Sequence, residues 1–358
     1  MSTAERADAA FLEAPPIAGL SESPMTAPQA VVAQILIGPW VAQPIYVLAT
    51  LGIADELREG PRTVEELAEA TGSHAPSLYR VLRLAAMFGV FAETEDGRFE
   101  LTPPAHALRT DVPGSLVGLA RWVGEDWHWR PWGQLLHTVK TGEQAFAKVH
   151  GKTIWDYLEE DRSAAETFNF AMAGHAIQNH STIIPAYDFS GIDTLCDVGG
   201  GEGALLALIL EHNPDLKGIV YDQPSVVETT RTRIAEAGLE DRMEAIGGSF
   251  FDSVPAGADA YMLTLIVHDW SDPEAIELLR NIRAVIPDDG RLLVLENVIP
   301  PGNEFGYGKV VDVEQLVAFS GRERTEEEYR ALFEAAGFTL DRIVPTAGPS
   351  SVLEGRPS

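Results

Sequence analysis

Along the second half of the chain, the pattern of hydrophobic and polar positions changes back and forth between one typical of strands and one typical of helices. Short apolar runs rich in branched and aromatic residues are each followed by a stretch with apolar residues at helical spacing. The runs are TLCDV, GIVYD, RMEAIGG, DAYMLTLIVH and RLLVLENV, with a late pair after residue 338. Strands that alternate with helices are typical of a doubly wound α/β sheet, which binds its ligands at the carboxyl ends of the strands. We therefore predict an α/β domain over residues 191–358.

The pattern in the first half predicts helices. Residues 28–58 carry almost no charge before Asp55, and a helix this apolar is normally buried. Pro39 and Pro44 should break or kink the segment. We expect two helices that insert into a neighbouring domain or subunit, because an apolar patch of this size is avoided on soluble monomers.

The next segment predicts a winged helix. A capping box at Thr63 and Glu66 begins a helix that Gly72 ends, and a second helix follows. Two short strands joined at Asp96-Gly97, a type I′ hairpin signal, complete the pattern. Winged helices can bind DNA, but the second helix offers only two basic residues, Arg80 and Arg83. We expect a dimerisation role instead.

Four regions are predicted in total. Residues 1–23 form a tail, 24–110 the winged-helix dimerisation domain, 111–190 a helical linker and substrate-pocket segment, and 191–358 the catalytic domain. The acidic N-terminus lacks the basic start and long apolar stretch of a signal peptide. We expect no apolar run that reaches the roughly 18 residues of a membrane span. We expect a cytoplasmic enzyme without membrane contact.

The amino-acid composition limits the kinds of molecule that the protein can bind. The net charge of −28 argues against nucleic acid, which is bound through Lys and Arg that release counterions, and against anionic membranes. Cys196 is the single cysteine and lies in a predicted buried strand, so neither a disulfide nor a cysteine zinc site can form within the chain. The five tryptophans of the linker segment suggest an aromatic pocket, although most tryptophans simply pack in cores; they are Trp122, Trp127, Trp129, Trp132 and Trp155.

The glycine-rich stretch 194–203, TLCDVGGGEG, predicts a strand, a tight turn and the start of a helix. Glycine lets a ligand approach the main chain, and the free N–H groups of a helix start can meet it. The turn alone is a weak signal, because the spacing of its glycines is not that of a dinucleotide-binding fingerprint. The same difference in spacing argues against an NAD-dependent dehydrogenase. Asp222 ends the next strand about 20 residues further on, where a carboxylate binds ribose hydroxyls. Together they predict an adenosine-type ligand.

One histidine stands out at a predicted strand end. His268 follows LTLIV and precedes a helix start, and such a histidine is often a cap or a satisfied core residue. At the carboxyl end of a strand, beside Asp269, it has the pKa range of a general base. Glu296, at the end of the following strand, could orient it through the second ring nitrogen.

The chain resembles the S-adenosylmethionine-dependent small-molecule O-methyltransferases of the caffeate and hydroxyneurosporene type, including enzymes that tailor bacterial aromatic natural products. The matching motifs are LCDVGGGEG, VYDQP, GGSFFDSVP, LIVHDWSDPEAIELLRNIRAVIPDDGRLLVLENVIP and GRERTEEEYRALFEAAGF, and the resemblance spans roughly residues 28 to 345. It implies a Rossmann-like class I methyltransferase fold, a homodimer formed through the winged-helix domain, and a role in secondary metabolism such as antibiotic biosynthesis.

The resemblance also implies roles for single residues. Gly199 and Gly201 would border the methionine part of the cofactor, Asp222 would bind its ribose, and Ser249 and Phe250 would lie at the adenine. Two departures are visible, since Ser249 replaces a frequent aspartate and Thr264 a lysine found in many plant members. Further residues from the same motifs complete the expected sites: Asp197 and Gln223 for the cofactor, and His268 as base, oriented by Glu296 and Glu323. For the acceptor we expect Asp269 beside the base, together with Trp127 of the tryptophan-rich segment and Phe168 and Met172 of the helix predicted over 166–184.

The expected reaction is methyl transfer to the hydroxyl of an aromatic acceptor, in line and without a metal. The acids around His268 were not expected to be spaced as a metal triad. Two alternatives stay open at this point. A relative could bind the cofactor but carry out another tailoring step, or the winged helix could make the protein a ligand-responsive DNA regulator, which a low-salt gel-shift would detect. Transfer to nitrogen is a further possibility, although a histidine base suits a hydroxyl better.

Overall fold

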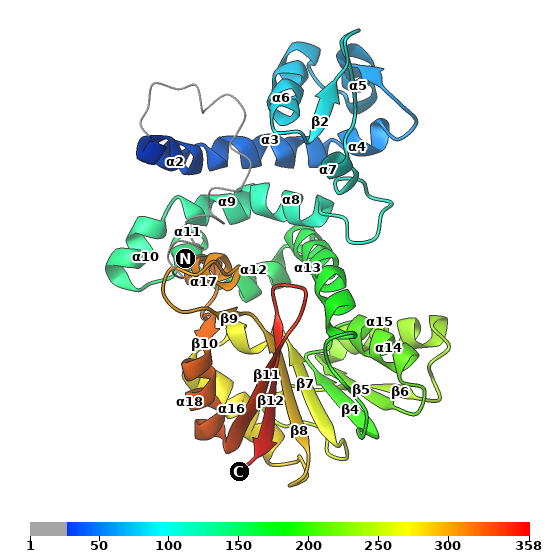
Figure 1. Cartoon of the computed structure of the whole chain (residues 1–358), viewed down its shortest axis with the longest axis vertical. Helices are drawn as coiled ribbons and strands as arrows, with labels where there is room; N and C mark the ends of the chain where they lie inside the picture. The colour runs from blue at the N-terminus through cyan, green and yellow to red at the C-terminus, as the bar shows by residue number, and fades with distance from the viewer. Residues whose placement is uncertain (1–26) are drawn as a thin grey trace, which may run out of the picture. The chain divides into compact units, whose positions relative to one another are not determined.

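The computed structural model describes residues 27–358 and, within that span, all side chains except those of residues 27, 28, 34, 173 and 175–181. The predicted tail, residues 1–23, lies outside the described residues. The chain forms two compact units (Figure 1). The first ends at residue 133 and takes in 155–175; the second combines 134–154 with 176–358. The segment 111–190 is thus divided between both units.

The apolar N-terminal stretch forms the two expected helices and a short third one, because the first helix breaks at Ile37, Pro39 starts the second, and a further turn of helix follows Gly52. Pro44 lies inside the second helix and does not end it. The elements are α2 (Ala27–Leu36), α3 (Gly38–Thr50) and α4 (Ile53–Glu56). By length and composition alone, Gln29–Thr50 would be able to cross a membrane. The sequence argument that no apolar stretch is long enough was therefore wrong, because uncharged glutamines, glycine and prolines do not lower the average hydropathy sufficiently.

The winged helix is confirmed. Thr63 and Glu66 bond each other's main-chain N–H groups in a capping box, and Gly72 ends the helix at φ 65°. The elements are β1 (Arg62–Thr63), α5 (Val64–Thr71), α6 (Ala75–Met87), β2 (Phe91–Glu93) and β3 (Arg98–Leu101), with the three strands in the antiparallel order β1-β3-β2.

The turn of the wing differs from the predicted type I′. That type needs positive φ at both central residues, but of the pair Asp96-Gly97 only Gly97 has a positive φ, 78°. Gly97 N–H donates to Thr94 O, and Thr94 N–H donates to Arg98 O. The loop is one residue longer than a type I′ hairpin allows, so only its last position requires glycine.

Among the remaining helices of the first unit, α8 packs on α3. Gly124 of α8 lies against the ring of Tyr46 so closely that a Cβ at this position would be 2.1 Å from the ring. The helices are α7 (Pro103–His106), α8 (Val117–Gly124), α9 (Asp126–Trp132), α12 (Ile154–Glu160) and α13 (Arg162–Ile183). The predicted linking helix, 166–184, corresponds to α13, which continues into the second unit.

The second unit is built on a seven-stranded sheet in the order β11-β12-β8-β7-β4-β5-β6. The five strands β4 to β8 pair in parallel with their neighbours, whereas β12 is antiparallel to both β11 and β8. The strands are β4 (Thr194–Val198), β5 (Lys217–Asp222), β6 (Met243–Gly247), β7 (Ala260–Thr264), β8 (Arg291–Glu296), β11 (Phe338–Pro345) and β12 (Ser351–Pro357). The predicted α/β class is confirmed.

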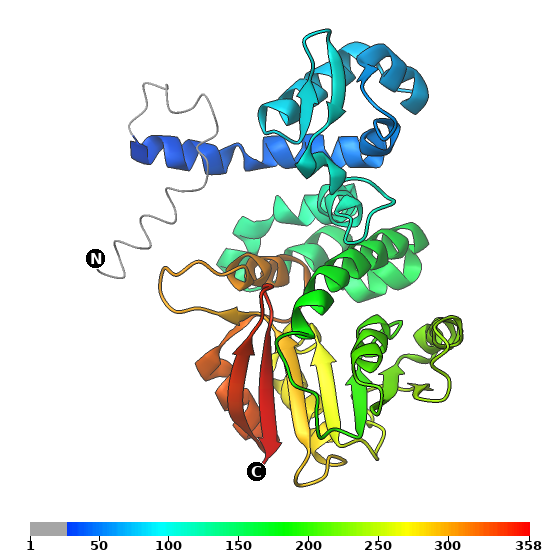
Figure 2. The same cartoon turned by 45° about the vertical axis from the view of Figure 1, so that its right-hand side comes forward.

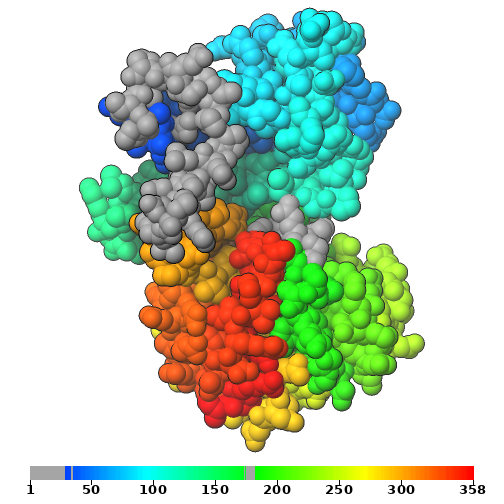
Figure 3. All heavy atoms as spheres, in the orientation of Figure 1, coloured from blue at the N-terminus to red at the C-terminus, as the bar shows by residue number. Residues whose placement is uncertain are grey.

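Helices cover both faces of this sheet (Figures 1 and 2). Successive residues of β4, Leu195 and Cys196, point into the two different cores. One core includes α14 (Ala204–His212) and α15 (Pro224–Glu236); the other includes α16 (Asp272–Arg283) and α18 (Glu326–Ala336). Strands buried on both faces explain why the apolar runs in the sequence are nearly continuous. The C-terminal hairpin of β11 and β12 is red in Figure 3.

The order of the strands decides where a ligand can bind. In the strand order, β5 and β6 lie on one side of β4, and β7, which follows later in the chain, is its neighbour on the opposite side. In such sheets the carboxyl ends of the two central strands form the ligand site. The short elements beyond these ends are η1 (Val267–Asp269), β9 (Val298–Ile299), α17 (Gly308–Ala318) and β10 (Arg324–Thr325), besides α10 (Leu135–Thr141) and α11 (Ala145–His150).

Candidate active site

The glycine turn follows β4 and has the backbone that only glycine adopts easily. Gly199, Gly201 and Gly203 have φ values of 74°, 57° and 79°. A Cβ at Gly199 would lie 2.7 Å from the side chain of Ile266, so this position has neither the backbone conformation nor the space for a larger residue. The turn therefore brings a bare main chain to the carboxyl edge of the sheet.

Asp222, at the end of β5, holds this turn. Its Oδ2 accepts a hydrogen bond from Gly201 N–H at 2.8 Å, and its Oδ1 accepts one from Gln223 N–H at 2.7 Å. A carboxylate has about four lone-pair sites, so two stay available for hydroxyl donors. Gln223 itself is exposed and precedes α15.

Asp197 is a buried carboxylate beneath the turn. Its side chain lies against Gly200, where a Cβ would be 2.8 Å from the carboxylate, and Oδ1 has no hydrogen-bond partner among the described residues. Burial, together with the nearby Asp222, raises the pKa of Asp197 to about 7. An unpartnered buried carboxylate favours a positively charged ligand group beside it.

Ser249 and Phe250 follow β6, also at the carboxyl edge. The Ser249 hydroxyl accepts a hydrogen bond from Phe251 N–H at 3.3 Å. Phe250 is partly buried, with ring centroids 4.8 Å from Phe251 and 6.0 Å from Trp270. Its ring is thus fixed by packing before any ligand binds.

The segment that carries His268 corrects the sequence prediction. The strand was expected to continue to His268, but β7 ends at Thr264 and His268 lies on the short helical turn η1. Leu265 interrupts the strand with a φ of 53°, unusual for a residue other than glycine. Its energetic cost is offset by bonds from other segments. Glu296 Oε1 accepts from Ile266 N–H at 3.1 Å and from His268 N–H at 3.2 Å.

The imidazole of His268 is surrounded by three carboxylates. Nδ1 lies 2.8 Å from Glu323 Oε1 and 3.6 Å from Glu296 Oε2, and Nε2 lies 3.5 Å from Asp269 Oδ1. Glu323, one of the two acids expected to orient His268, thus accepts the hydrogen bond of Nδ1, whereas Glu296, the other, lies 3.6 Å from the same nitrogen. Glu296 instead binds the main chain of the turn.

The charges in this cluster shift its titration. Burial alone would lower the pKa of the His268 imidazole, but its carboxylate neighbours outweigh burial and raise the pKa to about 10. Burial is the main cause that raises the pKa of Glu296 to about 7, and it also raises the pKa of Asp269. His268 is therefore a stronger base than a free histidine.

The spacing of this cluster corrects a second expectation. Single ligand atoms of His268, Glu296 and Glu323 all lie within 4.8 Å of one another, so the acids are close enough to hold a metal ion together. The resemblance had placed Glu296 and Glu323 at His268, but the distances between the two acids depend on segments far apart in the chain and could not be predicted. The hydrogen bonds described above already occupy one oxygen of each acid, and metal-free catalysis stays a prediction.

Residues 132–339 match the family model of an O-methyltransferase domain, and residues 33–111 match that of an O-methyltransferase dimerisation domain. The chain belongs to this O-methyltransferase family. It is 46% identical over 324 residues to the phenazine O-methyltransferase PhzM of Lysobacter antibioticus, covering 90% of this chain and 95% of the relative. It is 40% identical over 341 residues to the mitomycin biosynthesis 6-O-methyltransferase of Streptomyces lavendulae, covering 94% and 97%.

A solved structure adds the cofactor. The O-methyltransferase NcsB1 from neocarzinostatin biosynthesis, in complex with S-adenosylmethionine and 2-hydroxy-5-methyl naphthoic acid, matches with a TM-score of 0.77 and 32% identity, over 88% of this chain and 96% of NcsB1. The present chain is an S-adenosylmethionine-dependent O-methyltransferase of the type that acts on aromatic compounds in natural-product biosynthesis.

The residues of this O-methyltransferase fit its cofactor. Asp197 offers an unpartnered buried oxygen to a cationic group, and Gly199 leaves a main-chain surface that a Cβ would fill. Asp222 keeps lone pairs that can accept hydrogen bonds from hydroxyl groups. The structure thus brings the predicted cofactor residues together at one edge of one sheet.

The predicted acceptor residues are divided between the units. Trp127, Phe168 and Met172 belong to the first unit and Asp269 to the second, so a shared pocket stays a prediction. Within the first unit Trp127 stacks on Tyr157 with centroids 5.9 Å apart. Phe168 lies in a cluster with Trp122 and Trp155, at 5.9 and 6.0 Å.

Sequence reasoning missed several residues that support the site. Asn297 donates to Glu323 Oε1 at 3.1 Å, and Gln315 donates to Asp269 Oδ1 at 3.2 Å. Arg324 bonds the turn of His268. Asn297 and Arg324 each lie next to a residue that the motifs had singled out, and this adjacency was the available signal. Gln315 carried no signal of its own.

Proposed function

We propose that His268 is the general base of methyl transfer to a hydroxyl of a flat aromatic acceptor. The supporting observation is that Glu323 binds Nδ1, which leaves Nε2 as the nitrogen that can accept a proton. S-adenosylmethionine, when bound, supplies an electrophilic methyl group. The residues of the chain then have to position the acceptor and take up one proton.

The proton balance assigns a role to each atom. The acceptor hydroxyl gives its proton to His268 Nε2 as its oxygen forms the new bond to carbon. Nδ1–H stays bonded to Glu323, and the charge that develops on the imidazole is stabilised by the carboxylates around it. Because the pKa of His268 is raised to about 10, close to the pKa of about 10 of a phenol, proton transfer from a phenolic acceptor is nearly balanced in energy.

Each predicted cofactor residue receives a task in this proposal. Gly199 and Gly201 border the methionine part, with Asp197 nearby as the partner of a cationic group. Asp222, with Gln223 beside it, binds the ribose hydroxyls. Ser249 and Phe250 contact the adenine, where the packing of Phe250 against Trp270 holds the ring ready to stack.

The acceptor class follows from the relatives and from the aromatic residues. The relatives named above act on phenazine and mitomycin compounds, which suggests a fused ring system with a hydroxyl group. Trp127 and Phe168 would contribute aromatic faces, Met172 an adaptable apolar side chain, and Asp269 a polar contact beside the base. The location in the cytoplasm and the absence of nucleic-acid and membrane partners stay predictions from the sequence.

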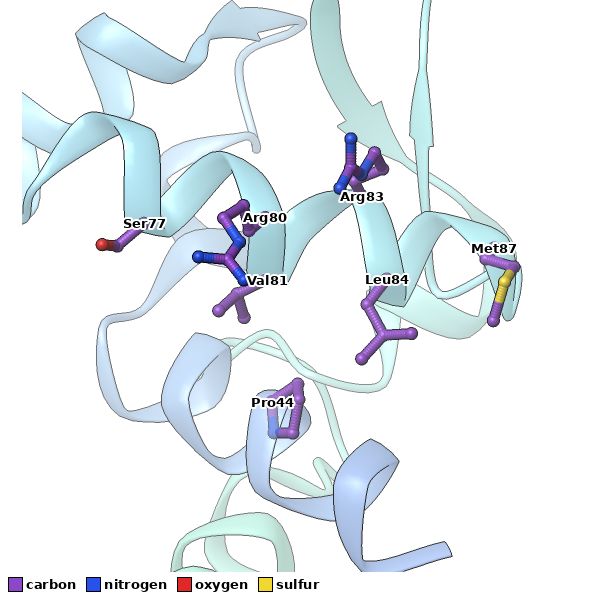
Figure 4. Close-up of a pocket in the computed structure, with 7 residues that line it drawn as sticks. All are labelled: Pro44, Ser77, Arg80, Val81, Arg83, Leu84 and Met87. Atoms are coloured by element: carbon purple, nitrogen blue, oxygen red, sulfur yellow. The ribbon is translucent and has the colours of Figure 1, made fainter. Parts of the chain in front are cut away.

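A homodimer formed through the first unit is part of the proposal. The dimerisation model covers α3 and the winged helix, and α2 and α3 expose Ile35, Leu36 and Trp40 at 68%, 68% and 72%. A groove of about 750 Å³ lies between α3 and α6, where Val81 and Leu84 face Pro44 (Figure 4). Sedimentation should show a dimer at micromolar concentration, and a stable monomer there would refute this part.

The test of the base separates binding from chemistry. In His268→Ala, turnover of a hydroxyphenazine should fall by about 10²- to 10⁴-fold, while calorimetry should find the affinity for S-adenosylmethionine nearly unchanged. His212→Ala, which removes an exposed histidine at the end of α14 and outside the cluster, is the matched control. Turnover near that of the wild type in His268→Ala would refute the assignment of the base.

A further inference from the structure

Arg324 is completely buried although it carries a charge, and every N–H group of its guanidinium has an acceptor. Nε and Nη2 donate to Asp272 Oδ1 at 2.9 and 2.8 Å. Nη1 donates to the carbonyl of Val267 at 3.0 Å and to that of Arg322 at 3.3 Å, and Nη2 donates to the carbonyl of Trp270 at 2.9 Å. These five bonds account for all five donors of the side chain.

The carbonyls that Arg324 binds lie on either side of His268. Val267 precedes it, and Trp270 follows it after one residue. The N–H of His268 is bound by Glu296, as described above, so both sides of this short turn are held by side chains from other strands.

The segment around Arg324 also contacts His268 in two further ways. Glu323 binds the ring at Nδ1. Gly321 packs on the main chain of the same turn, where a Cβ would lie 1.8 Å from the His268 carbonyl oxygen. Residues 321–324 therefore hold the ring and the main chain of His268 together.

We propose that Arg324 is a positioning residue for methyl transfer: it fixes the turn of η1 so that the His268 ring presents Nε2 to the acceptor. The inference rests on the proposed role of His268 as the base. An uncharged or shorter side chain cannot replace the planar five-donor fork of arginine, and lysine offers only three donors from one point. Asp272 is half exposed, so an ion pair with Asp272 alone would not require the arginine to be buried.

The first experiment replaces Arg324 by lysine. We expect kcat in Arg324→Lys to fall by about 10- to 100-fold, since a misplacement near 1 Å can cost that much. The Kd of S-adenosylmethionine should stay within about threefold, because the glycine turn is held by other residues. Arg330→Lys is the matched control, since Arg330 pairs with Glu326 on the exposed side of α18, and its kcat should not change.

A double variant distinguishes positioning from general support of the fold. If Arg324 acts through His268, Arg324→Lys should cause no further loss of turnover in the His268→Ala background. An equal fold-loss in both backgrounds, a loss of cofactor binding in Arg324→Lys, or an unchanged kcat would each overturn the inference. A failure of the base assignment itself is visible separately, in the single variant His268→Ala.

A second variant covers the case in which Arg324→Lys does not fold. Asp272→Asn changes a half-exposed side chain and leaves Arg324 in place, but it removes the charge that holds the guanidinium. We expect kcat to fall by about three- to tenfold, with the same dependence on His268. An unchanged kcat in this variant would count against the positioning role.

Discussion

Two turns at the carboxyl edge of the sheet solve the same problem in different ways. The turn 199–203 follows β4, and the turn 265–270 follows the neighbouring strand β7. The first is shaped by its own glycines, three of which have positive φ. The second contains Leu265 at a positive φ without any glycine, and side chains from β8 and from residues 321–324 hold it in place. Thus the backbone of the glycine turn is shaped mainly by its own residues, with Asp222 of β5 as an added support, whereas the turn of His268 depends on distant segments for its conformation.

The two turns contact each other through Gly199 and Ile266. Their functions should therefore separate only for substitutions that do not disturb the other turn. A substitution in the glycine turn should impair cofactor binding first. A substitution around His268 should impair turnover and leave cofactor binding nearly intact. The following predictions test this difference, from the largest expected effect to the smallest.

Gly199→Val should weaken cofactor binding strongly. The new side chain would clash with Ile266 at about 2.7 Å, and its backbone would be strained at φ 74°. Strain of about 1–3 kcal/mol together with overpacking of about 1–3 kcal/mol corresponds to a loss of affinity of roughly 30-fold or more. Calorimetry with S-adenosylhomocysteine measures it, and Gly302→Val, at a positive φ on an open loop, serves as the control for backbone strain alone. Normal affinity in Gly199→Val would show that the turn does not need glycine.

Glu323→Gln should lower kcat by about 10- to 100-fold with the cofactor Kd unchanged, because an amide stabilises an imidazolium less well than a carboxylate. It should also change the pH dependence. The three carboxylates raise the pKa of His268, and neutral imidazole is the active form, so the rate of the wild type should rise with pH toward about 10. Removal of one negative charge lowers this pKa, and the rising limb should move to lower pH. A limb that stays in place would contradict the role of Glu323.

Asp222→Asn should raise the Kd of S-adenosylmethionine by about tenfold. An amide keeps one acceptor for the N–H groups of Gly201 and Gln223 but loses the charge-assisted bonds to the ribose hydroxyls. The kcat at saturating cofactor should change less than twofold, since the turn of His268 is untouched. A large loss of kcat would mean that Asp222 acts beyond the cofactor.

Removal of divalent metal ions should have the smallest effect. The cluster of His268, Glu296 and Glu323 has a spacing that could hold an ion, but its hydrogen bonds already bring these groups together. Turnover after treatment with EDTA and gel filtration should stay within about twofold of the untreated enzyme, and added zinc should not raise it. An activity that disappears and returns with one metal would replace the general-base proposal by a metal-assisted one.

The glycine turn and the capping box at Thr63 could be predicted from the sequence, because each is encoded by residues close in the chain. The position of Asp222 at the end of its strand was predicted as well, but its bond to Gly201 joins two strands and is visible only in the structure. His268 was also singled out from the sequence, since it follows an apolar run, and its role as the base stays a prediction. Its surroundings were only partly found: the strand was expected to extend four residues too far, and Glu296 was expected to bind the ring.

The sequence by itself determined the α/β class, the winged helix and the residue types at the strand ends, since periodicity, glycine and capping residues encode local structure directly. Only the tertiary structure decided which acid binds which atom of His268, that the three acids lie close together, and that Arg324 holds the turn. The physical reason is that these contacts join β7, β8 and the segment before α18, which are far apart in the chain. Their distances are set by strand order and packing, and no pattern within a single segment contains that information.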